Sequence, residues 1–318
     1  MYKDGTFIMN DISESNIASL EKQNSVLAEK RICELSTLAR EAASDICKMV
    51  SDGYGIYEIL SVLSELKIGG NNQPHSTVLT ENSKRVRGYL LSASISDKVV
   101  FTELLLEYSK KYGFSVSESD FLDTESLDET FTYVKNPLSD EAYDVFSQDF
   151  SDPRVSYSQS FKEACKKVSE GDVEYCLLPL EERGGARLRA IAELLFRTDL
   201  KICSVTPVFG LDGIADVKYA LVSKHFNLPL HEEGDDRYLE IRLNSASSLS
   251  PAELFAASEM LSLKCYRINN VSFETEDGRE EYYSVVFKTE EGDFSELLTF
   301  LTLYAGTYTP VGIYKNLE

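Results

Sequence analysis

Histidine is scarce in this chain, and the few histidines form no pattern. Three of the 318 residues are histidine (His75, His225 and His231), and none is spaced from a cysteine or a carboxylate as metal ligands are. We therefore expect no metal site and no cofactor. A catalytic site built on histidine is disfavoured for the same reason.

Paired cysteines and long apolar runs are also missing. The six cysteines include no C-x-x-C pair, and several lie in apolar runs such as "EYCLL" and "KICSV". This pattern is typical of free, buried thiols in a reducing cytosol, so we expect a cytoplasmic protein. The first sixteen residues lack a basic start and an apolar core, and no apolar run approaches the roughly 20 residues of a membrane span. We expect neither a signal peptide nor a membrane partner.

Positive charge is in deficit. Lysine and arginine number 32 against 53 acidic residues, which gives a formal net charge of −21. Such a balance argues against a nucleic-acid backbone or an anionic membrane as partner. The alternative is that the charge serves only to keep the protein in solution.

The chain is long enough for two or three domains, and its first segment, residues 1–70, reads as helical. Apolar residues recur at three- and four-residue spacing between Ile17 and Met49, which predicts one long helix. A shorter helix is expected at 56–67. The polar stretch 69–88 reads as a linker.

Residues 85–230 alternate between strand-like and helix-like stretches. We expect strands at 87–94, 114–119, 154–157, 173–180, 200–208 and 217–224, and helices at 97–112, 158–171 and 185–197. The acidic stretch 120–153 has weak periodicity and reads as a surface insertion. This alternation favours an α/β fold with a mostly parallel sheet.

Residues 236–318 follow a different order. Strand-like stretches at 237–244, 265–276, 280–290 and 308–317 alternate with helix-like stretches at 250–263 and 293–306. Asp277-Gly278 is a tight-turn signal between the two central strands. The resulting order βαββαβ predicts a ferredoxin-like α+β domain.

One short stretch places polar residues where α/β proteins bind their ligands. In "VEYCLLPLEERGG", the residues Pro179, Glu181, Glu182 and Arg183 crowd the carboxyl end of an apolar strand. The stretch is either a binding edge or a capped turn.

The same region carries a family resemblance. Residues 160–205 resemble prephenate dehydratase, with Gly171, Asp172, Pro179, Glu181, Gly184, Leu194, Leu195 and Ile202 on the pattern of that family. The C-terminal βαββαβ order is similar to the ACT domain that follows the dehydratase, with Gly312 and Tyr314 matching its last strand. "VLAEKRICEL" resembles the first helix of chorismate mutases. The resemblance implies a mutase-like segment (1–70), a dehydratase-like α/β domain (85–230) and an ACT domain (236–318).

The resemblance implies a substrate site and also changes in it. Ser92 and Ser94 fall where the family has a glycine-rich loop, and Pro179 to Arg183 fall on its Pro-Ile-Glu-Asn-Ser motif. The family's Thr-Arg-Phe becomes Val217-Lys218-Tyr219, and a valine donates no proton. Only Val208 to Asp216 stand where the family has a whole second lobe. The resemblance therefore implies a single periplasmic-binding-protein-like lobe, with Lys218 kept as a binding cation and dehydratase chemistry lost.

The helical segment and the ACT-like segment carry weaker matches. Lys30 and Arg31 match mutase cations, but Glu41 stands where that motif has a lysine, so a helical dimerisation arm is favoured. Effector binding is expected, if retained, at the residues matching the ACT motifs: Ser248, Leu249, Asn269, Asn270 and Ser272. The implied ligand is a small aromatic or carboxylate molecule, and the implied assembly is a homo-oligomer.

Three hypotheses on function are open at this point. The chain is a dehydratase relative of phenylalanine metabolism that binds a ligand or regulates without dehydratase chemistry, or an active mutase and dehydratase, or an oligomeric scaffold. Val217 and the missing lobe favour the first and the third.

Overall fold

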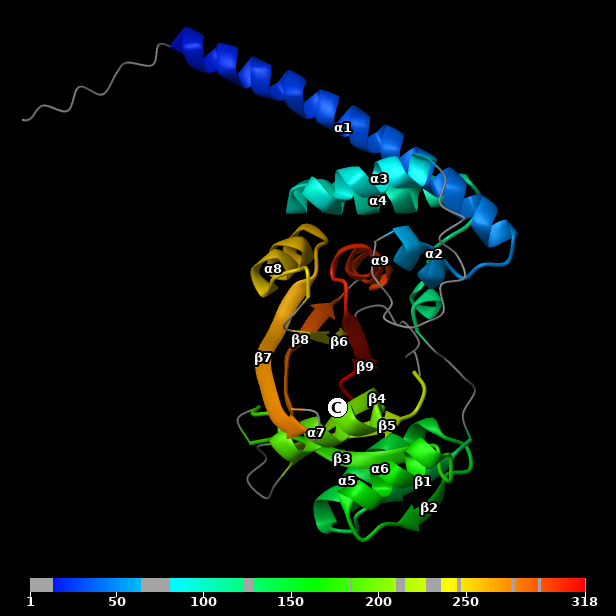
Figure 1. Ribbon diagram of the computed structural model, residues 1–318. Coiled ribbons are helices and arrows are strands. Elements are labelled where there is room, and N and C mark those ends of the chain that lie inside the picture. Colours follow the sequence, from blue (N-terminus) through cyan, green and yellow to red (C-terminus); the bar gives the residue numbers. More distant parts are fainter. Residues whose placement is uncertain are drawn as a thin grey trace, which may run out of the picture.

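A computed structural model describes residues 14–63, 81–122, 128–183, 185–209, 215–226, 236–244, 247–275, 278–290 and 293–317. Its strands form one nine-stranded mixed sheet in the order β2-β1-β3-β5-β4-β9-β6-β8-β7. The sheet has a five-stranded half and a four-stranded half, joined at β4 and β9. Figure 1 shows the two halves one above the other, with a layer of helices on the far side of the four-stranded half.

The five-stranded half contains β1 to β5 and α5 to α7. Its strands are β1 (Thr130–Tyr133), β2 (Arg154–Tyr157), β3 (Tyr175–Glu182), β4 (Lys201–Phe209) and β5 (Ala215–Ser223), and its helices are α5 (Pro137–Phe146), α6 (Phe161–Glu170) and α7 (Arg189–Thr198). β1 runs parallel to both β2 and β3, whereas β5 is antiparallel to β3 and β4. This half of the sheet is therefore mixed: β1, β2, β3 and β4 run in one direction, as the expected mostly parallel sheet requires, and β5 runs in the opposite direction. The direct pairing of β4 with β5, up to Phe209 with Ala215, leaves no room for a second lobe between them.

Two helices of this half, α5 and α6, begin at residues with ordinary capping chemistry. Asn136 caps α5 through the N–H groups of Leu138 and Ser139, and Pro137 occupies its first turn. Ser160 caps α6, which ends at Gly171 in the left-handed conformation with a φ of 79°. α6 and α7 then pack on β3, with Leu178, Leu180 and Ile202 at the centre of their shared core.

The four-stranded half contains β6 to β9 and two helices. Its elements are β6 (Arg237–Asn244), α8 (Pro251–Met260), β7 (Lys264–Thr275), β8 (Gly278–Thr289), α9 (Ser295–Tyr304) and β9 (Tyr308–Lys315). The predicted order βαββαβ is observed, and the strand order β9-β6-β8-β7 is ferredoxin-like. Because side chains alternate along a strand, β6 turns Leu239, Ile241 and Leu243 toward α8 and α9. Tyr238, Glu240 and Arg242 occupy the opposite face.

A helical layer covers α8 and α9. It consists of α1 (Glu14–Ser51), α2 (Ile56–Leu63), α3 (Glu81–Ser92) and α4 (Ile95–Lys111). The predicted stripe on α1 is buried in its second half, where Leu35, Leu38 and Ile46 belong to the core shared with α9. The first half of α1 extends beyond the rest of the molecule (Figure 1), with Val26 and Leu27 exposed. No helix in the described part of the chain is both long enough and apolar enough to span a membrane.

Four expectations from the sequence are wrong. Residues 87–94, expected as a strand, lie mostly in α3, and the expected strand 114–119 is irregular chain followed by the short 3-10 helix 118–120. The last residues of the expected linker, 81–88, also belong to α3, while 69–80 lie outside the described residues. The expected insertion 120–153 contains β1 and α5, which begin the five-stranded half. Tertiary pairing with β2 and β3 overrides the weak local pattern of these short elements.

The two halves meet where Gly312 of β9 pairs with Ile202 of β4. A Cβ atom placed on Gly312 would collide with the carbonyl oxygen of Ile202 and lie 2.8 Å from its Cβ. The sheet is continuous at this point only because residue 312 has no side chain.

We predict that Gly312→Ala lowers the free energy of unfolding by about 1–3 kcal/mol, as overpacking in a core does. Urea denaturation followed by circular dichroism measures this. The control is Gly88→Ala in the exposed part of α3, where a Cβ meets nothing within 4 Å; it is expected to gain about 0.5–1 kcal/mol. Equal effects of the two substitutions would contradict the close approach of β4 and β9.

Candidate functional site

The carboxyl end of β3 is covered by the four-stranded half. Glu181 is only 6% exposed, and its carboxylate forms an ion pair with the guanidinium of Arg267 from β7. A register shift between Pro179 and Glu181 leaves Glu181 opposite Lys218 of β5. The predicted edge therefore meets charged residues from its own half and from the other half.

Little space is left at this edge. The cavity beside Glu181, Lys218 and Arg267 has a volume of about 10 Å³, which is at the lower limit for a single water molecule. Tyr238 and Tyr314 close it from the four-stranded half. In this conformation the carboxyl end of β3 has no room for an organic substrate.

A second ion pair lies next to the first. Arg187, in the segment between β3 and α7, pairs with Glu240 in the middle of β6. Glu240 also accepts hydrogen bonds from Ser284 Oγ at 2.9 Å and from Tyr314 Oη at 3.4 Å. Burial and the neighbouring Glu240 carboxylate both raise the pKa of Tyr314. Burial alone would lower the pKa of Arg187, but the interactions with Glu240, Tyr314 and Glu181 together outweigh burial and the pKa rises.

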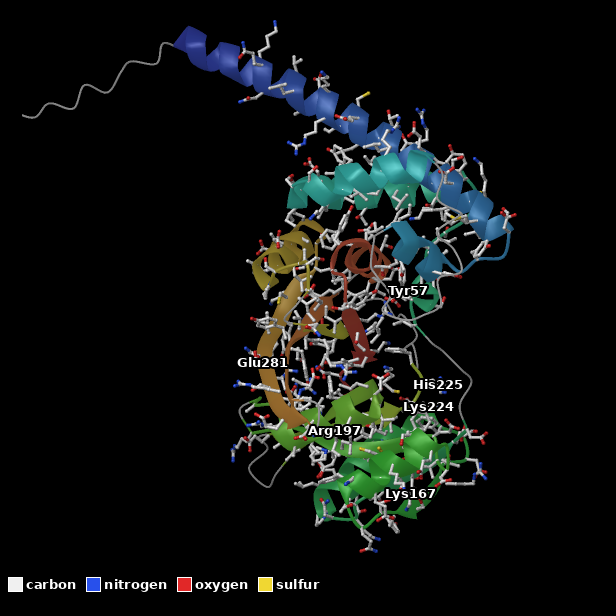
Figure 2. The ribbon with its side chains drawn as sticks, in the orientation of Figure 1. Tyr57, Lys167, Arg197, Lys224, His225 and Glu281 are labelled. Carbon is white, nitrogen blue, oxygen red and sulfur yellow. The ribbon has the colours of Figure 1, made fainter. Side chains whose placement is uncertain are left out.

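A third group of charges closes the interface at the end of α7. Asp199, which follows α7, accepts from Arg242 Nη2 at 2.7 Å and lies 2.9 Å from Lys201 Nζ. The guanidinium of Arg242 lies 5.1 Å from the ring of Phe196, in a cation–π contact. Arg197 of α7 is labelled in Figure 2 at the level where the two halves meet.

The two serines expected to bind substrate lie elsewhere. Ser94 caps α4, where its hydroxyl donates to Asp97 at 2.7 Å, and Ser92 donates to the carbonyl of Tyr89. Both belong to the helical layer, so their assignment to the substrate site is not supported by their positions. The first strand of the five-stranded half is β1, and the loop at its carboxyl end is residues 134–136.

The remaining predicted residues around β3 divide between core and solvent. Tyr219 is buried and Val217 is half-buried, and both pack in the aromatic cluster around Phe131. Burial raises the pKa of Tyr219. Glu182, the last residue of β3, and Arg183, in the turn that follows, are both exposed. Of the seven residues predicted for this site, only Pro179, Glu181 and Lys218 lie together at the covered edge.

The five residues expected to bind an effector do not form one site. Ser248 donates to the carbonyl of Tyr304 at the end of α9, and Leu249 is buried beside it. Asn269 and Asn270 lie in the middle of β7 rather than in a turn, opposite Ser284 and Tyr283. The backbone carbonyl of Ser272 accepts from Arg189.

The mutase-like cations are used within the helical layer. Arg31 pairs with Asp97 of α4, and Glu41 pairs with Arg85 of α3. Lys30 is exposed. These contacts hold α1 against α3 and α4.

Sequence reasoning missed Arg187, Glu240, Arg242 and Arg267. In "RYLEIRLN" the alternation predicts one polar face of a strand, and a polar face normally meets water. The sequence did contain one signal of this buried charge: Glu240 and Arg242 carry charge on the same face of an otherwise apolar strand. The packing of β3, the Arg187 segment and α7 against this face makes it an interior.

Thiols and acidic groups offer no metal centre in the described residues. All six cysteines are free, and Cys165, Cys176 and Cys203 are buried, as the sequence predicts. Within the described ranges no group of three or more histidine, cysteine or acidic side chains is placed to hold a metal ion.

Comparison with known proteins gives similarities to solved structures alone. No family model and no curated protein sequence matches the chain. Prephenate dehydratase from Streptococcus mutans is similar, with a TM-score of 0.47 and 13% identity, over 60% of this chain and 100% of that chain. GqqA, described as a novel type of quorum-quenching acylase, gives a TM-score of 0.43 and 16% identity, over 59% and 95%. Prephenate dehydratase from Arthrobacter aurescens in complex with L-Phe gives 0.41 and 12%, over 58% and 89%. These values describe a partial likeness of fold and assign no activity.

We predict that the Glu181–Arg267 pair is strongly coupled. Arg267→Met leaves a buried carboxylate unpaired and is expected to cost about 3–5 kcal/mol of unfolding free energy, whereas Glu181→Gln with Arg267→Met is expected to cost far less. Urea denaturation of the two single variants and the double variant gives the coupling energy.

The control is Arg279→Met, which breaks the exposed pair with Glu281. It is expected to cost less than about 1 kcal/mol. Additive effects of the substitutions at 181 and 267 would show that the two halves are not joined by this pair.

Proposed function

We propose that the chain is a relative of prephenate dehydratases that binds a small ligand, or regulates, without dehydratase chemistry. The proposal begins from the residues that resemble the family, among them Gly171, Pro179, Glu181 and Ile202. In this proposal the α/β unit begins at β1, because the preceding helices α3 and α4 pack on α1. Residues 236–318 form an ACT domain.

One observation supports the proposed loss of dehydratase activity. The place that the family resemblance assigns to the substrate is the covered edge of β3, where Arg267 binds Glu181 and about 10 Å³ of space is left. A substrate with two carboxylates would have to displace Arg267 and then face the Glu181 carboxylate. Unless another charge neutralised Glu181, that approach would be repulsive.

The hydroxyl expected for dehydration is also missing from the described site. Val217 stands at the threonine position of the resemblance and packs in the apolar cluster around Phe131. Its neighbour Tyr219 is buried in the same cluster, and its pKa is raised by burial. Neither side chain is placed to protonate a leaving hydroxyl group.

We predict that the purified chain forms no phenylpyruvate from prephenate. The measurement is phenylpyruvate absorbance in alkali, after incubation at neutral pH, against a sample without protein that corrects for spontaneous decay. The control variant is Lys166→Ala, on the exposed surface. If prephenate turnover above this background is lost in Lys218→Ala and retained in the control, the proposal is overturned in favour of an active enzyme.

Second, we propose that the chain self-associates. Two surfaces with exposed apolar side chains support this proposal. β7 is the last strand of the sheet, and Tyr266 and Ile268 on it are 48% and 46% exposed. A long edge strand with apolar side chains is a ready site for pairing with another strand. Leu27 on the first half of α1 is 63% exposed.

We predict a homo-oligomer whose stability depends on one of these surfaces. Sedimentation velocity at several concentrations measures the mass of the wild type and of Ile268→Lys and Leu27→Lys, with Gln148→Lys on the outer side of the five-stranded half as control. At least one of the first two is expected to shift the chain toward monomer. A monomeric wild type at all concentrations would contradict self-association.

A further inference from the structure

A cleft lies between α7 and the polar face of the four-stranded half, away from the covered edge of β3. Its inner chamber, between Arg187, Ala192 and Asn269, has a volume of about 20 Å³, enough for one water-sized group. An outer groove of about 370 Å³ adjoins it and shares Phe196, Arg242 and Tyr282 with it. The groove alone falls within the range of small-molecule sites, roughly 300–1,000 Å³.

Two buried arginines that line the chamber keep donors without a partner. The side chains of Arg187 and Arg242 are 9% and 10% exposed. The Nη1 of Arg187 and the Nε of Arg242 have no hydrogen-bond partner among the described residues. Buried donors are nearly always satisfied, because an unsatisfied one destabilises the folded state. Both arginines line the chamber, so an acceptor that reached these atoms from it would satisfy them.

Cations outnumber buried acids around the cleft. The largely buried charged side chains that line the chamber are Arg187 and Arg242 on the positive side and Glu240 on the negative side. Asp199, which is 64% exposed, adds one negative charge at the surface. One further negative charge inside the chamber would balance its buried groups, so the acceptor that fits there is an anion.

The walls of the cleft also favour a flat apolar group. The rings of Phe196 and Tyr282 stack with their centroids 5.6 Å apart and their planes 7° from parallel. Both rings line the chamber and the groove, so a third ring entering the groove meets an aromatic surface. Aromatic pairs in such arrangements stabilise a contact beyond the burial of their apolar area.

The rim of the groove sets a limit on ligand charge. Asp199, Glu280 and Glu281 line the outer groove, and Figure 2 labels Glu281 on the four-stranded half. A second carboxylate on the ligand would lie among these acids and be repelled. The cleft therefore selects against dicarboxylates.

We propose that this cleft binds a small monocarboxylate carrying an aromatic ring. One carboxylate oxygen enters the inner chamber and accepts from Arg187 Nη1 and Arg242 Nε, and the ring lies in the outer groove against Phe196 and Tyr282. The inference rests on the proposed function, ligand binding without dehydration, and it names the site and the ligand class.

Isothermal titration calorimetry of the full chain tests the ligand class with four probes. Phenylacetate carries both features, phenylacetamide lacks the charge, acetate lacks the ring, and phenylmalonate adds a second carboxylate. Saturable binding of phenylacetate is expected, with at least tenfold weaker binding of the other three. L-Phenylalanine, as a fifth probe, shows whether an ammonium group beside the acidic rim strengthens binding. Absence of phenylacetate binding, or equal binding of phenylacetamide, would overturn the proposal.

Variants locate the site. Ala192→Leu on α7 fills the inner chamber without changing charge, and Arg242→Gln removes one donor while its partner Asp199 stays in solvent. Each is expected to weaken phenylacetate binding at least tenfold. Arg197→Gln is the matched control on the same helix, since its guanidinium bonds Glu193 and the carbonyl of Glu274 outside the cleft. Circular dichroism confirms that each variant is folded.

The outcomes separate this inference from the proposed function. Phenylacetate binding that is unchanged in both Ala192→Leu and Arg242→Gln would place the ligand elsewhere and overturn the inference, whatever the prephenate assay shows. Turnover of prephenate would overturn the loss of chemistry and would leave the binding measurements at this cleft as they are.

Discussion

The carboxylate of Glu240 is the group on which the joint between the two halves depends. It lies in the middle of β6 and receives Arg187 from the β3–α7 segment, Ser284 from β8 and Tyr314 from β9. A carboxylate this deeply buried is tolerated only when paired and hydrogen-bonded. The segment that carries Arg187 must therefore lie against β6. Its position in turn places α7 on the polar face of the four-stranded half.

This arrangement has opposite effects at the two sides of the Arg187 segment. On one side, β7 brings Arg267 onto Glu181 and fills the carboxyl end of β3. On the other side, α7 approaches the sheet through Ala192 and Phe196. These two side chains differ too much in volume to fill the space between helix and sheet evenly. The usual ligand position of an α/β fold is thus closed, and space is kept where two layers of secondary structure meet. Interfaces of this kind are common places for small-molecule sites.

The sequence predicts which helices and strands form better than it predicts what packs against them. Long, periodic or well-capped segments such as α1, β3, α6 and the βαββαβ order could be read from spacing and caps. Thr130–Tyr133 could not, because four residues carry little periodicity and their pairing with β2 and β3 is not local. For α5 a signal was present in Asn136-Pro137, a cap followed by a first-turn proline. The charges of the site were visible as residues, but their burial depends on packing between halves that lie far apart in sequence.

Distance decides which charges act on an anion that approaches this chain. The net charge of −21 argues against anionic partners in general, yet most of that charge lies on surface residues in water. At physiological ionic strength charges farther than about 8 Å are largely screened, whereas partly buried ones are screened much less. Arg187 and Arg242 therefore act at short range on an anion inside the cleft, where Glu240 is the buried acid beside them, and Glu280 and Glu281 at its rim act mainly on groups that stay outside. A ligand with a single carboxylate moves that group past the acidic rim into the cleft, where the arginines act on it. A ligand with two carboxylates cannot place both of them inside the cleft.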